Sequence, residues 1–586
     1  MANFTNLTTL SLSECKLQGE FPKAILQLQT LHHLDLSNNQ DLSGGFPEFQ
    51  RNGSLETVSL SFTNFSGLLP DSIGHLHNLS RIELSRCKFT GSIPSTMANL
   101  KSLTYVDFSN NNFVGHLPSF QLSKKLTYID VSHNALTGLL SSLHFKGLSE
   151  LKYVNLGSNL LRGNIPPNLF SLPSLHSLYL NENLFDAQVN EFANASSSQL
   201  DTLDLSSNLL NGSIPKSFFN LSKLSVLSLS SNFFSGKMQF NVIQKLPYLR
   251  VLDLSYNSLT VDTTNRIEAM FSSPQIRVLN LASCKLIKFP DFRNQSKMER
   301  LDLSDNQING SIPNWIWQVG NGGLTLLNLS YNLLENLEEP YRINKSLAVI
   351  DLHSNRLQGN LPIPPASSIY VDYSDNNFSS VIPHEIGNSL AVAAFISLSN
   401  NTLKGKIPNS FCNSSWLQVL DLSQNLLSED SFEDNPGLCG CPLNRTCTPS
   451  PTSEPTPHNS VSTVNSDTDW LFTFIGLGFG LGMAVGIAPL WFSKQWRTWC
   501  DKQLRKLIKQ IFPTYGFTYI RYNGARVVAE ETIQEFTEDS DEIEDEEEDT
   551  EFHGSRNIGR DWLEGFERRA DDHYFHTCLL IFGVLE

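Results

Sequence analysis

The residue types that usually carry out catalysis occur in this 586-residue chain, but no spacing brings them into a known catalytic arrangement. The 14 histidines show no HExxH-type spacing, and no motif places a histidine or an aspartate to activate any serine. Cys439, Cys441 and Cys447 form a CxC…C group, yet no histidine lies close by to complete a zinc site. The sequence therefore predicts no enzyme, no metal and no cofactor.

A repeated pattern, LxxLxLSxNxLxGxIPxxxxxLxx, dominates residues 7–427 and determines how the remaining side chains are positioned. Its eighteen units begin 21 to 27 residues apart, a spacing typical of leucine-rich repeats. The last two leucines of LxxLxL are two residues apart, so both face one side of a short strand. The pattern predicts an α/β solenoid, a right-handed superhelix with a parallel sheet on its concave face.

The asparagine after each strand is expected to bond backbone groups of the neighbouring turn and to form a ladder. Cys15, Cys87 and Cys284 occupy the same position in SECKL, SRCKF and ASCKL, which predicts structural thiols. Proline cannot donate a backbone hydrogen bond and glycine permits a positive φ, so each GxIP segment predicts an irregular second strand followed by a turn.

Three stretches lack the GxIP half or replace it, and there we expect loops or short helices on the convex side or flank. These stretches are residues 186–199, 262–274 and 334–346.

Strand positions between the two leucines of LxL are expected to face solvent on the concave side. Ten of them hold acids, which could bind a cationic peptide or could serve the scaffold as part of the repeat's ordinary LDLS consensus. The more variable strand positions are better candidates for ligand specificity, because exposed aromatic and imidazole groups on a rigid surface often contact ligands. The candidates are Tyr105, Tyr128, Tyr153, His176 and Tyr179.

The GxIP segments, such as Gly91–Pro94, Gly163–Pro166 and Gly405–Pro408, are the plant-specific version of this repeat. With them, the region resembles the ectodomain of plant receptor-like proteins, the kinase-less relatives of leucine-rich-repeat receptor kinases. The resemblance covers nearly all of residues 1–512 and is nearest to the Verticillium-wilt-resistance and Cf-type disease-resistance receptors. It implies an extracellular solenoid over residues 1–428 that binds a ligand.

The segment SFEDNPGLCGCPLNRTC is similar to the one that follows the last repeat in these receptors. The resemblance implies a C-terminal cap over residues 429–447, closed by a Cys439–Cys447 disulfide, while Cys441 leaves the pairing ambiguous. Residues 448–469 are rich in Pro, Ser and Thr and predict a stalk. The chain begins inside a repeat and its last repeat stops at Leu427, which predicts a truncated form lacking the repeats where a co-receptor kinase docks in the family.

Residues 470–492 hold no charge over 23 positions, long enough to cross a bilayer as one helix. Lysines and arginines follow in the basic juxtamembrane segment 493–512, which predicts a cytosolic C-terminal side. We therefore expect a single-pass type I protein of the plasma membrane. Glycines one helical turn apart also predict association with another membrane helix. They are Gly476, Gly478, Gly480, Gly482 and Gly486.

All sixteen N-x-S/T sequons precede the hydrophobic segment, which supports an extracellular N-terminal side and predicts glycosylation. The acceptor residues are Asn3, Asn6, Asn52, Asn64, Asn78, Asn194, Asn211, Asn220, Asn294, Asn309, Asn328, Asn344, Asn377, Asn400, Asn413 and Asn444.

The 94 residues after the hydrophobic segment contain none of the motifs that a protein kinase needs. Residues 513–586 are predicted to be an acidic and largely disordered tail, because Glu530–Glu551 holds fourteen acids in 22 positions. The net charge of -17 argues against nucleic acid as the main partner.

Together these features predict a kinase-less cell-surface receptor of plant defence. It would bind a pathogen- or damage-derived peptide, protein or glycan and signal through a receptor-like kinase that pairs with its membrane helix and juxtamembrane region. Three alternatives stay open: a developmental receptor-like protein for an endogenous peptide, a soluble inhibitor of microbial wall-degrading enzymes, and a non-signalling truncated remnant.

Overall fold

The computed structural model describes residues 6–51, 53–263, 274–428, 521–522 and 525–526. The chain divides into two compact units, 1–447 and 448–586. In the second unit the described residues form one antiparallel pair, β35 (Arg521–Tyr522) with β36 (Ala525–Arg526). Among all the described residues, no helix combines the length and the hydrophobicity needed to cross a membrane. The predicted membrane segment, residues 470–492, lies outside them.

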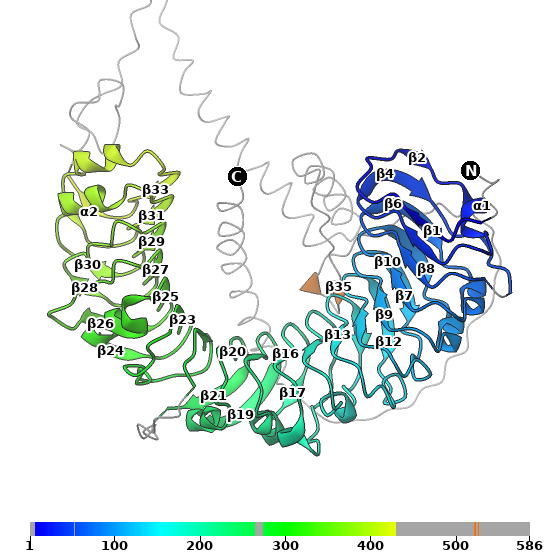
Figure 1. The fold of residues 1–586 in the computed structure, drawn as a ribbon. Helices are drawn as coiled ribbons and strands as arrows, with labels where there is room; N and C mark the ends of the chain where they lie inside the picture. Colours follow the sequence, from blue (N-terminus) through cyan, green and yellow to red (C-terminus); the bar gives the residue numbers. More distant parts are fainter. Residues whose placement is uncertain (1–5, 52, 264–273, 429–520, 523–524, 527–586) are drawn as a thin grey trace, which may run out of the picture. The chain divides into compact units, whose positions relative to one another are not determined.

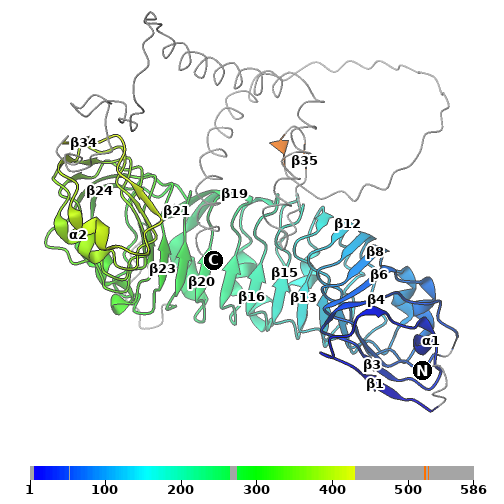
Figure 2. The same ribbon diagram turned by 90° about the horizontal axis from the view of Figure 1, so that it is seen from above.

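The first unit is a solenoid built on one parallel sheet of eighteen three-residue strands, which we call the inner sheet (Figure 1). Consecutive strands pair in sequence order, and Figure 2 shows β13 to β23 side by side. The strands are β1 (Thr9–Ser11), β3 (His33–Asp35), β5 (Thr57–Ser59), β7 (Arg81–Glu83), β9 (Tyr105–Asp107), β11 (Tyr128–Asp130), β13 (Tyr153–Asn155), β15 (Ser177–Tyr179), β16 (Thr202–Asp204), β18 (Val226–Ser228), β20 (Val251–Asp253), β22 (Val278–Asn280), β23 (Arg300–Asp302), β25 (Leu326–Asn328), β27 (Val349–Asp351), β29 (Tyr370–Asp372), β31 (Phe395–Ser397) and β33 (Val419–Asp421).

A second set of parallel strands comes mostly from the GxIP halves, as predicted. The early repeats form one seven-stranded sheet of β2 (Gly19–Glu20), β4 (Asn39–Gly44), β6 (Thr63–Leu68), β8 (Lys88–Ser92), β10 (Asn112–His116), β12 (Ala135–Leu139) and β14 (Leu160–Arg162). Later repeats form smaller sheets: β17 (Asn211–Gly212), β19 (Phe233–Gln239) and β21 (Ser258–Asp262); β24 (Asn309–Ile312) and β26 (Leu333–Leu337); β28 (Gln358–Gly359) and β30 (Asn377–Phe378); β32 (Lys404–Gly405) and β34 (Leu426–Leu427).

Short helices, most of them 3-10, connect these second strands to the next repeat. Most begin directly after a proline, whose fixed φ suits the entry to a helix; η2, for example, follows Pro94 at φ -59°. The helices are α1 (Lys23–Leu26), η1 (Asp71–His75), η2 (Ser95–Asn99), η3 (Pro167–Leu169), η4 (Ala195–Ser197), η5 (Lys216–Asn220), η6 (Phe240–Lys245), η7 (Asn314–Gly322), α2 (His384–Ser389) and η8 (Asn409–Asn413).

The leucines of each repeat fill the space between the two sets of strands. Leu31, Leu34 and Leu36 show the arrangement, since all three are fully buried. Each buried leucine contributes roughly 1.5–3 kcal/mol through removal of apolar surface from water. Because each repeat packs mainly on its neighbours, this core continues along the first unit without a boundary.

The predicted asparagine ladder is confirmed. Asn111 donates from Nδ2 to the carbonyl oxygens of Leu84, Phe108 and Ser109 at 2.7, 3.1 and 3.2 Å. Its Oδ1 accepts from the backbone N–H of Phe89 at 3.0 Å, so one side chain satisfies three backbone acceptors and one backbone donor. The residue before each ladder position turns the chain with a positive φ, as Asn110 does at 54°.

The two buried ladder cysteines behave as predicted. Cys87 Sγ donates to the carbonyl oxygen of Leu60 at 3.1 Å, and Cys284 Sγ lies 3.6 Å from that of Leu254. Burial raises the pKa of both thiols. For Cys284, burial and then the nearby carboxylates of Asp253 and Asp302 raise the pKa to about 12. Both stay protonated and unreactive near neutral pH.

The prediction for the three irregular stretches is only partly correct. Residues 186–199 do form loops with one short helix, η4. Residues 334–337, however, belong to strand β26, which pairs with β24 through a register shift. A strand forms there without GxIP because residues Leu333–Leu337 pair with the backbone of the neighbouring β24, whose N–H and C=O groups need hydrogen-bond partners. Of residues 262–274, the structure describes Asp262 at the end of β21, Thr263 and Pro274.

Candidate ligand surface

The inner sheet presents two outward side chains per strand. In β9 the middle residue, Val106, is fully buried, while Tyr105 and Asp107 on either side of it are half-buried and face away from the core. The same alternation recurs in the neighbouring strands β7, β13 and β15. Because the strands are in register, residues at equivalent positions form columns that cross the sheet.

The third residues of the strands, many of them aspartates, form a column that we call the acid column. Its carboxylates serve mainly the scaffold. Asp107 Oδ1 accepts from the backbone N–H of Ser109 at 3.0 Å and from its hydroxyl at 2.7 Å. The Oδ1 atoms of Asp35 and Asp204 make the same pair of bonds to Ser37 and Ser206. Asp130 is itself buried and binds Ser132 in this way. The carboxylates thereby close the turn that follows each strand, which favours the scaffold interpretation over a cationic-peptide site.

The first-residue column carries a continuous aromatic stack, which we call the tyrosine stack: Tyr105, Tyr128 and Tyr153. The rings of Tyr105 and Tyr128 are 4.2 Å apart and nearly parallel, and those of Tyr128 and Tyr153 are 4.5 Å apart and nearly parallel. The three residues are direct register partners in β9, β11 and β13. Ring stacking adds about 0.5–1.5 kcal/mol per pair and holds the rings in place before any ligand arrives.

A cation closes one end of the stack. The Arg81 guanidinium carbon lies 3.7 Å from the centre of the Tyr105 ring, and Arg81 also forms an ion pair with Glu83 on the same strand. Arg81 was not among the residues that the sequence singled out. It occupies the same strand position as Tyr105 one repeat earlier, so comparison of equivalent positions could have found it.

At the other end, Tyr179 lies against the stack at an angle. Its ring is 5.7 Å from that of Tyr153 and inclined by 49°, because Tyr179 belongs to the acid column, where Asn155 is its register partner. His176 is exposed just before β15, and its Nδ1 lies 2.7 Å from the carbonyl oxygen of Ser174. The structure thus brings the four predicted tyrosines together, whereas His176 makes none of these ring contacts.

The phenols of this surface are held neutral. Burial raises the pKa of Tyr105, Tyr128, Tyr153 and Tyr179, and nearby carboxylates such as Asp130 add to the effect at Tyr128 and Tyr153. For Tyr153 the pKa rises to about 12. Since each ring face is covered by its neighbour, a ligand meets ring edges and neutral hydroxyl groups that can donate or accept hydrogen bonds.

A shorter aromatic pair occupies the same column further along the sheet. Tyr370 and Phe395 stack at 4.5 Å with an interplanar angle of 8°. The Tyr370 hydroxyl donates to Asp372 Oδ2 at 3.2 Å. Burial, and then the neighbouring Asp372 carboxylate, hold the pKa of Asp351 well above its usual range. The sequence reasoning missed this pair, although both residues stand at the same repeat position as Tyr105.

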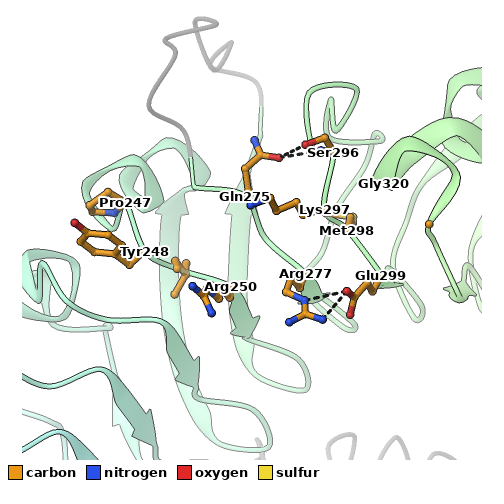
Figure 3. A pocket seen from close by; sticks show the side chains of 12 residues that line it. Pro247, Tyr248, Arg250, Gln275, Arg277, Ser296, Lys297, Met298, Glu299 and Gly320 are labelled. Atoms are coloured by element: carbon orange, nitrogen blue, oxygen red, sulfur yellow. Dashed lines mark hydrogen bonds and ion pairs between the residues drawn. The ribbon is translucent and has the colours of Figure 1, made fainter.

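A cavity of about 660 Å³ opens at the edge of the inner sheet where strands β20, β22 and β23 begin (Figure 3). The loops that enter these strands supply most of its lining. Its charged residues are Arg250, Arg277, Lys297 and Glu299. The sequence reasoning did not identify it, because its shape depends on how three neighbouring loops pack. Among the described residues, no group of three or more His, Cys, Asp or Glu side chains is arranged to hold a metal ion.

Most sequon asparagines that the structure describes are exposed and none is buried. Their exposure is compatible with glycosylation, which stays a prediction. Asn328 differs in its position, because it lies on strand β25 of the inner sheet. Its Oδ1 accepts from the N–H and hydroxyl of Ser330 at 3.0 and 2.7 Å, as an aspartate of the acid column does. Asn3, Asn52 and Asn444 lie outside the described residues, and the side chain of Asn413 is not described.

The predicted disulfide Cys439–Cys447, the ambiguous Cys441 and the glycine face from Gly476 to Gly486 also lie outside the described residues. They stay predictions from the sequence.

Repeat geometry and sequence agree on the class of protein, a leucine-rich-repeat solenoid. Family models described as leucine-rich repeat match residues 124–185 and seven further segments. These segments are residues 6–28, 54–76, 78–100, 102–121, 199–221, 297–319 and 394–414.

Its homologues are receptor-like proteins of Arabidopsis thaliana, which confirms the predicted resemblance to plant leucine-rich-repeat receptor-like proteins. The chain is 34% identical to receptor-like protein 6 over 29% of its length and 43% identical to receptor-like protein 49 over 41% of its length. These matches span 17% and 28% of the two relatives.

Solved receptor ectodomains share the fold. The ectodomain of the Arabidopsis receptor kinase HAESA, in complex with an extended IDA peptide hormone, is 26% identical with a TM-score of 0.57; the alignment covers 76% of this chain and 77% of that one. The complex PEPR1–AtPEP1 is 27% identical with a TM-score of 0.53, covering 76% and 69%.

Proposed function

We propose that this protein is a kinase-less cell-surface receptor of plant defence. Its inner sheet binds an extracellular peptide or protein ligand, and a partner receptor-like kinase carries the signal onward. The observation that supports this proposal most is the tyrosine stack with Arg81 at its end. A row of fixed aromatic rings crosses three consecutive strands on the surface that the repeat leaves open.

The stack suits an extended ligand that runs across the strands. Aromatic side chains offer large contact areas at low cost in conformational entropy, and these rings are already held by their neighbours. The HAESA ectodomain, which shares the fold, is described as a complex with a peptide hormone ligand, which supports a peptide as the ligand here. The neutral hydroxyl groups along the stack provide donors and acceptors for a peptide backbone.

The arrangement along the chain belongs to the same proposal. Residues 1–428 form the extracellular solenoid, 429–447 cap it with a Cys439–Cys447 disulfide, and 448–469 are a stalk. Residues 470–492 cross the plasma membrane and pair with the kinase through their glycines, with the basic segment 493–512 and the acidic tail 513–586 on the cytosolic side.

A developmental receptor for an endogenous peptide is the second candidate. The peptide-hormone complex among the structures that share the fold favours it. The two functions differ in the ligand and use the same surface, so one experiment addresses both.

The test expresses the full chain in leaf tissue that lacks it and applies two probes separately, a microbial culture extract and a panel of synthetic plant peptide hormones. Cytosolic calcium is the readout. We expect the extract to give a response that depends on the wild-type chain and that needs about tenfold more extract with Tyr128→Ala. Phe233→Ala removes an exposed ring from strand β19 of the second set and should leave the response intact.

A response to the hormone panel alone would favour the developmental function. Equal responses with and without the chain, or equal losses for Tyr128→Ala and Phe233→Ala, would overturn the proposed ligand surface.

A further inference from the structure

The cavity at the start of β20, β22 and β23 has a chemistry of its own. Three cations, Arg250, Arg277 and Lys297, line it together with one acid, Glu299. Consecutive repeats supply them, since Arg250 immediately precedes β20, Arg277 precedes β22, and Lys297 and Glu299 come from the loop before β23. The cavity therefore holds an excess of positive charge on a chain whose net charge is -17.

The single acid is already engaged. Glu299 Oε1 accepts from Arg277 Nε at 2.9 Å and from Nη2 at 2.6 Å, and Figure 3 shows the two side chains turned toward each other. The side chains of Arg250 and Lys297 have no hydrogen bond or ion pair to any residue within the described part of the chain. Two exposed cations thus remain beside the cavity with their charge unbalanced locally.

The acids of the same strands do not offset this charge at close range. Asp253 and Asp302 stand at the far ends of β20 and β23, and Asp253 lies three residues, about 10 Å along the strand direction, after Arg250. Asp253 Oδ1 accepts from the N–H of Ser255 and Asp302 Oδ1 from that of Ser304, at 3.0 and 2.9 Å. The strands carry positive charge where they begin and negative charge where they end.

The rest of the lining is fixed and leaves room. Gln275 Oε1 accepts from the N–H and hydroxyl of Ser296, both at 2.9 Å, so the neutral polar groups are held in place (Figure 3). Gly320 has φ +70°, and a Cβ there would lie 2.0 Å from the carbonyl oxygen of Met298, so that position cannot carry a side chain without backbone movement.

An aromatic residue borders the cavity. The Tyr248 side chain is 57% exposed, and the Lys223 ammonium lies 5.8 Å from its ring centre. The volume of about 660 Å³ exceeds what a single inorganic anion needs and lies within the range of sites that hold a small organic group. A residue with a charged end and a carbon chain fits this combination of cations and an exposed ring.

We propose that this cavity binds the carboxylate side chains of an acidic segment of a polypeptide ligand. The Arg250 guanidinium can take a carboxylate in a two-point geometry, and Lys297 adds a second positive charge that no acid of the cavity balances. The inference rests on the proposed function for the nature of the ligand, a peptide, and deepens it by assigning that peptide an acidic segment.

The test measures binding of a fluorescein-labelled hexaglutamate peptide to the purified full chain by fluorescence anisotropy, with hexaglutamine as the uncharged control. We expect hexaglutamate alone to bind. The double variant Arg250→Gln/Lys297→Gln should weaken binding about tenfold. Arg162→Gln/Lys404→Gln removes two exposed cations from β14 and β32 of the second set of strands, away from the cavity, and should change the affinity less than twofold.

Glu299→Gln supplies a change of opposite sign. Loss of its charge frees Arg277 for the ligand, so hexaglutamate should bind several-fold more tightly. Glu335→Gln, at an exposed position of β26, makes the same change in net charge away from the cavity and should have little effect. Circular dichroism verifies that each variant is folded.

Equal effects of the cavity variants and their matched controls would overturn the proposal, since binding would then follow net charge. Binding of inorganic sulfate or an oligogalacturonide in place of hexaglutamate would overturn the assignment to a peptide. These results are separate from the tyrosine-stack test. If hexaglutamate binding needs Arg250 while Tyr128→Ala leaves the leaf response unchanged, the cavity proposal holds and the proposed ligand surface is wrong.

Discussion

The repeats from β7 to β15 and those from β20 to β25 use one design and yield different surfaces. In the first region, β8, β10, β12 and β14 continue one second sheet, and the inner-sheet columns carry stacked rings. In the second region, the second sheet ends at β21 and resumes at β24, and a cavity opens at the edge of the inner sheet. Regular repeats place equivalent side chains in one row. Irregular repeats move neighbouring loops apart and leave a cavity between them.

The largest expected effect concerns what keeps the regular region regular. Asn111→Ala leaves three carbonyl oxygens and one N–H without their partner, so we expect the free energy of unfolding to fall by about 3 kcal/mol. Asn112→Ala, one residue away and exposed, should stay within about 0.5 kcal/mol of wild type. Urea titration followed by circular dichroism gives both values, and similar losses would contradict the role of the ladder.

The second effect concerns the cavity region. Gly320→Ala forces a Cβ against the carbonyl of Met298 in addition to the cost of a positive φ, so we expect about 2–3 kcal/mol of destabilisation. Gly236→Ala, at φ +93° with no atom within 4 Å of the added Cβ, carries the backbone cost alone and should lose about 1 kcal/mol. The same titration compares them; equal losses would mean that the close approach at Met298 is unimportant.

The third effect is the pH dependence of the tyrosine stack. The folded chain raises the pKa of Tyr153 to about 12 from an ordinary value of 10.0, so it favours the neutral phenol. The stability that this provides is complete below pH 10 and is lost as the pH rises toward 12. In urea titrations, the free energy of unfolding of Tyr153→Phe should therefore fall less between pH 10 and pH 12 than that of the wild type.

Absorbance at 295 nm offers a direct control for that prediction. Phenols of the stack should ionise later in the folded chain than in the same chain unfolded in urea, and Tyr153→Phe should remove part of the late change. Coincident titration curves for the folded and unfolded chains would refute the neutral stack.

The smallest effect is the coupling between Arg81 and Tyr105. A double-mutant cycle of Arg81→Ala and Tyr105→Ala should give an interaction free energy of about 0.5–1 kcal/mol from the cation and the ring. Added salt should change it little, because the Arg81–Glu83 pair lies on one strand and is removed in both halves of the cycle. A coupling near zero would leave Arg81 outside the surface.

Much of this architecture follows from the sequence because the repeat fixes register. Leu34 and Leu36 identify a strand and its buried face, and Asn111 identifies the turn after a strand. The same register places Tyr105, Tyr128 and Tyr153 in one column, which is why the sequence could point to them. Their nearly parallel ring stacking depends on rotamers that a sequence pattern does not specify.

Other features depend on contacts that the repeat does not encode. Strand β26 forms by pairing with β24 despite the missing GxIP segment, so composition alone predicted a loop. The cavity arises where the loops before β20, β22 and β23 meet, so no single repeat reveals it in the sequence. The repeat register does place Arg81 beside Tyr105, but the contact of its guanidinium with the ring depends on side-chain conformations that the repeat does not encode.

The Asp–Ser turns also limit how such a surface can diversify. Where an aspartate must hold the serine two residues later, replacing it would weaken the scaffold, so new specificity has to arise mainly at the first position of each strand. Recognition then resembles a narrow track with rows spaced about 4.8 Å apart. Molecules that lie lengthwise along such a track can be told apart row by row, whereas a compact object would touch only a few rows at once.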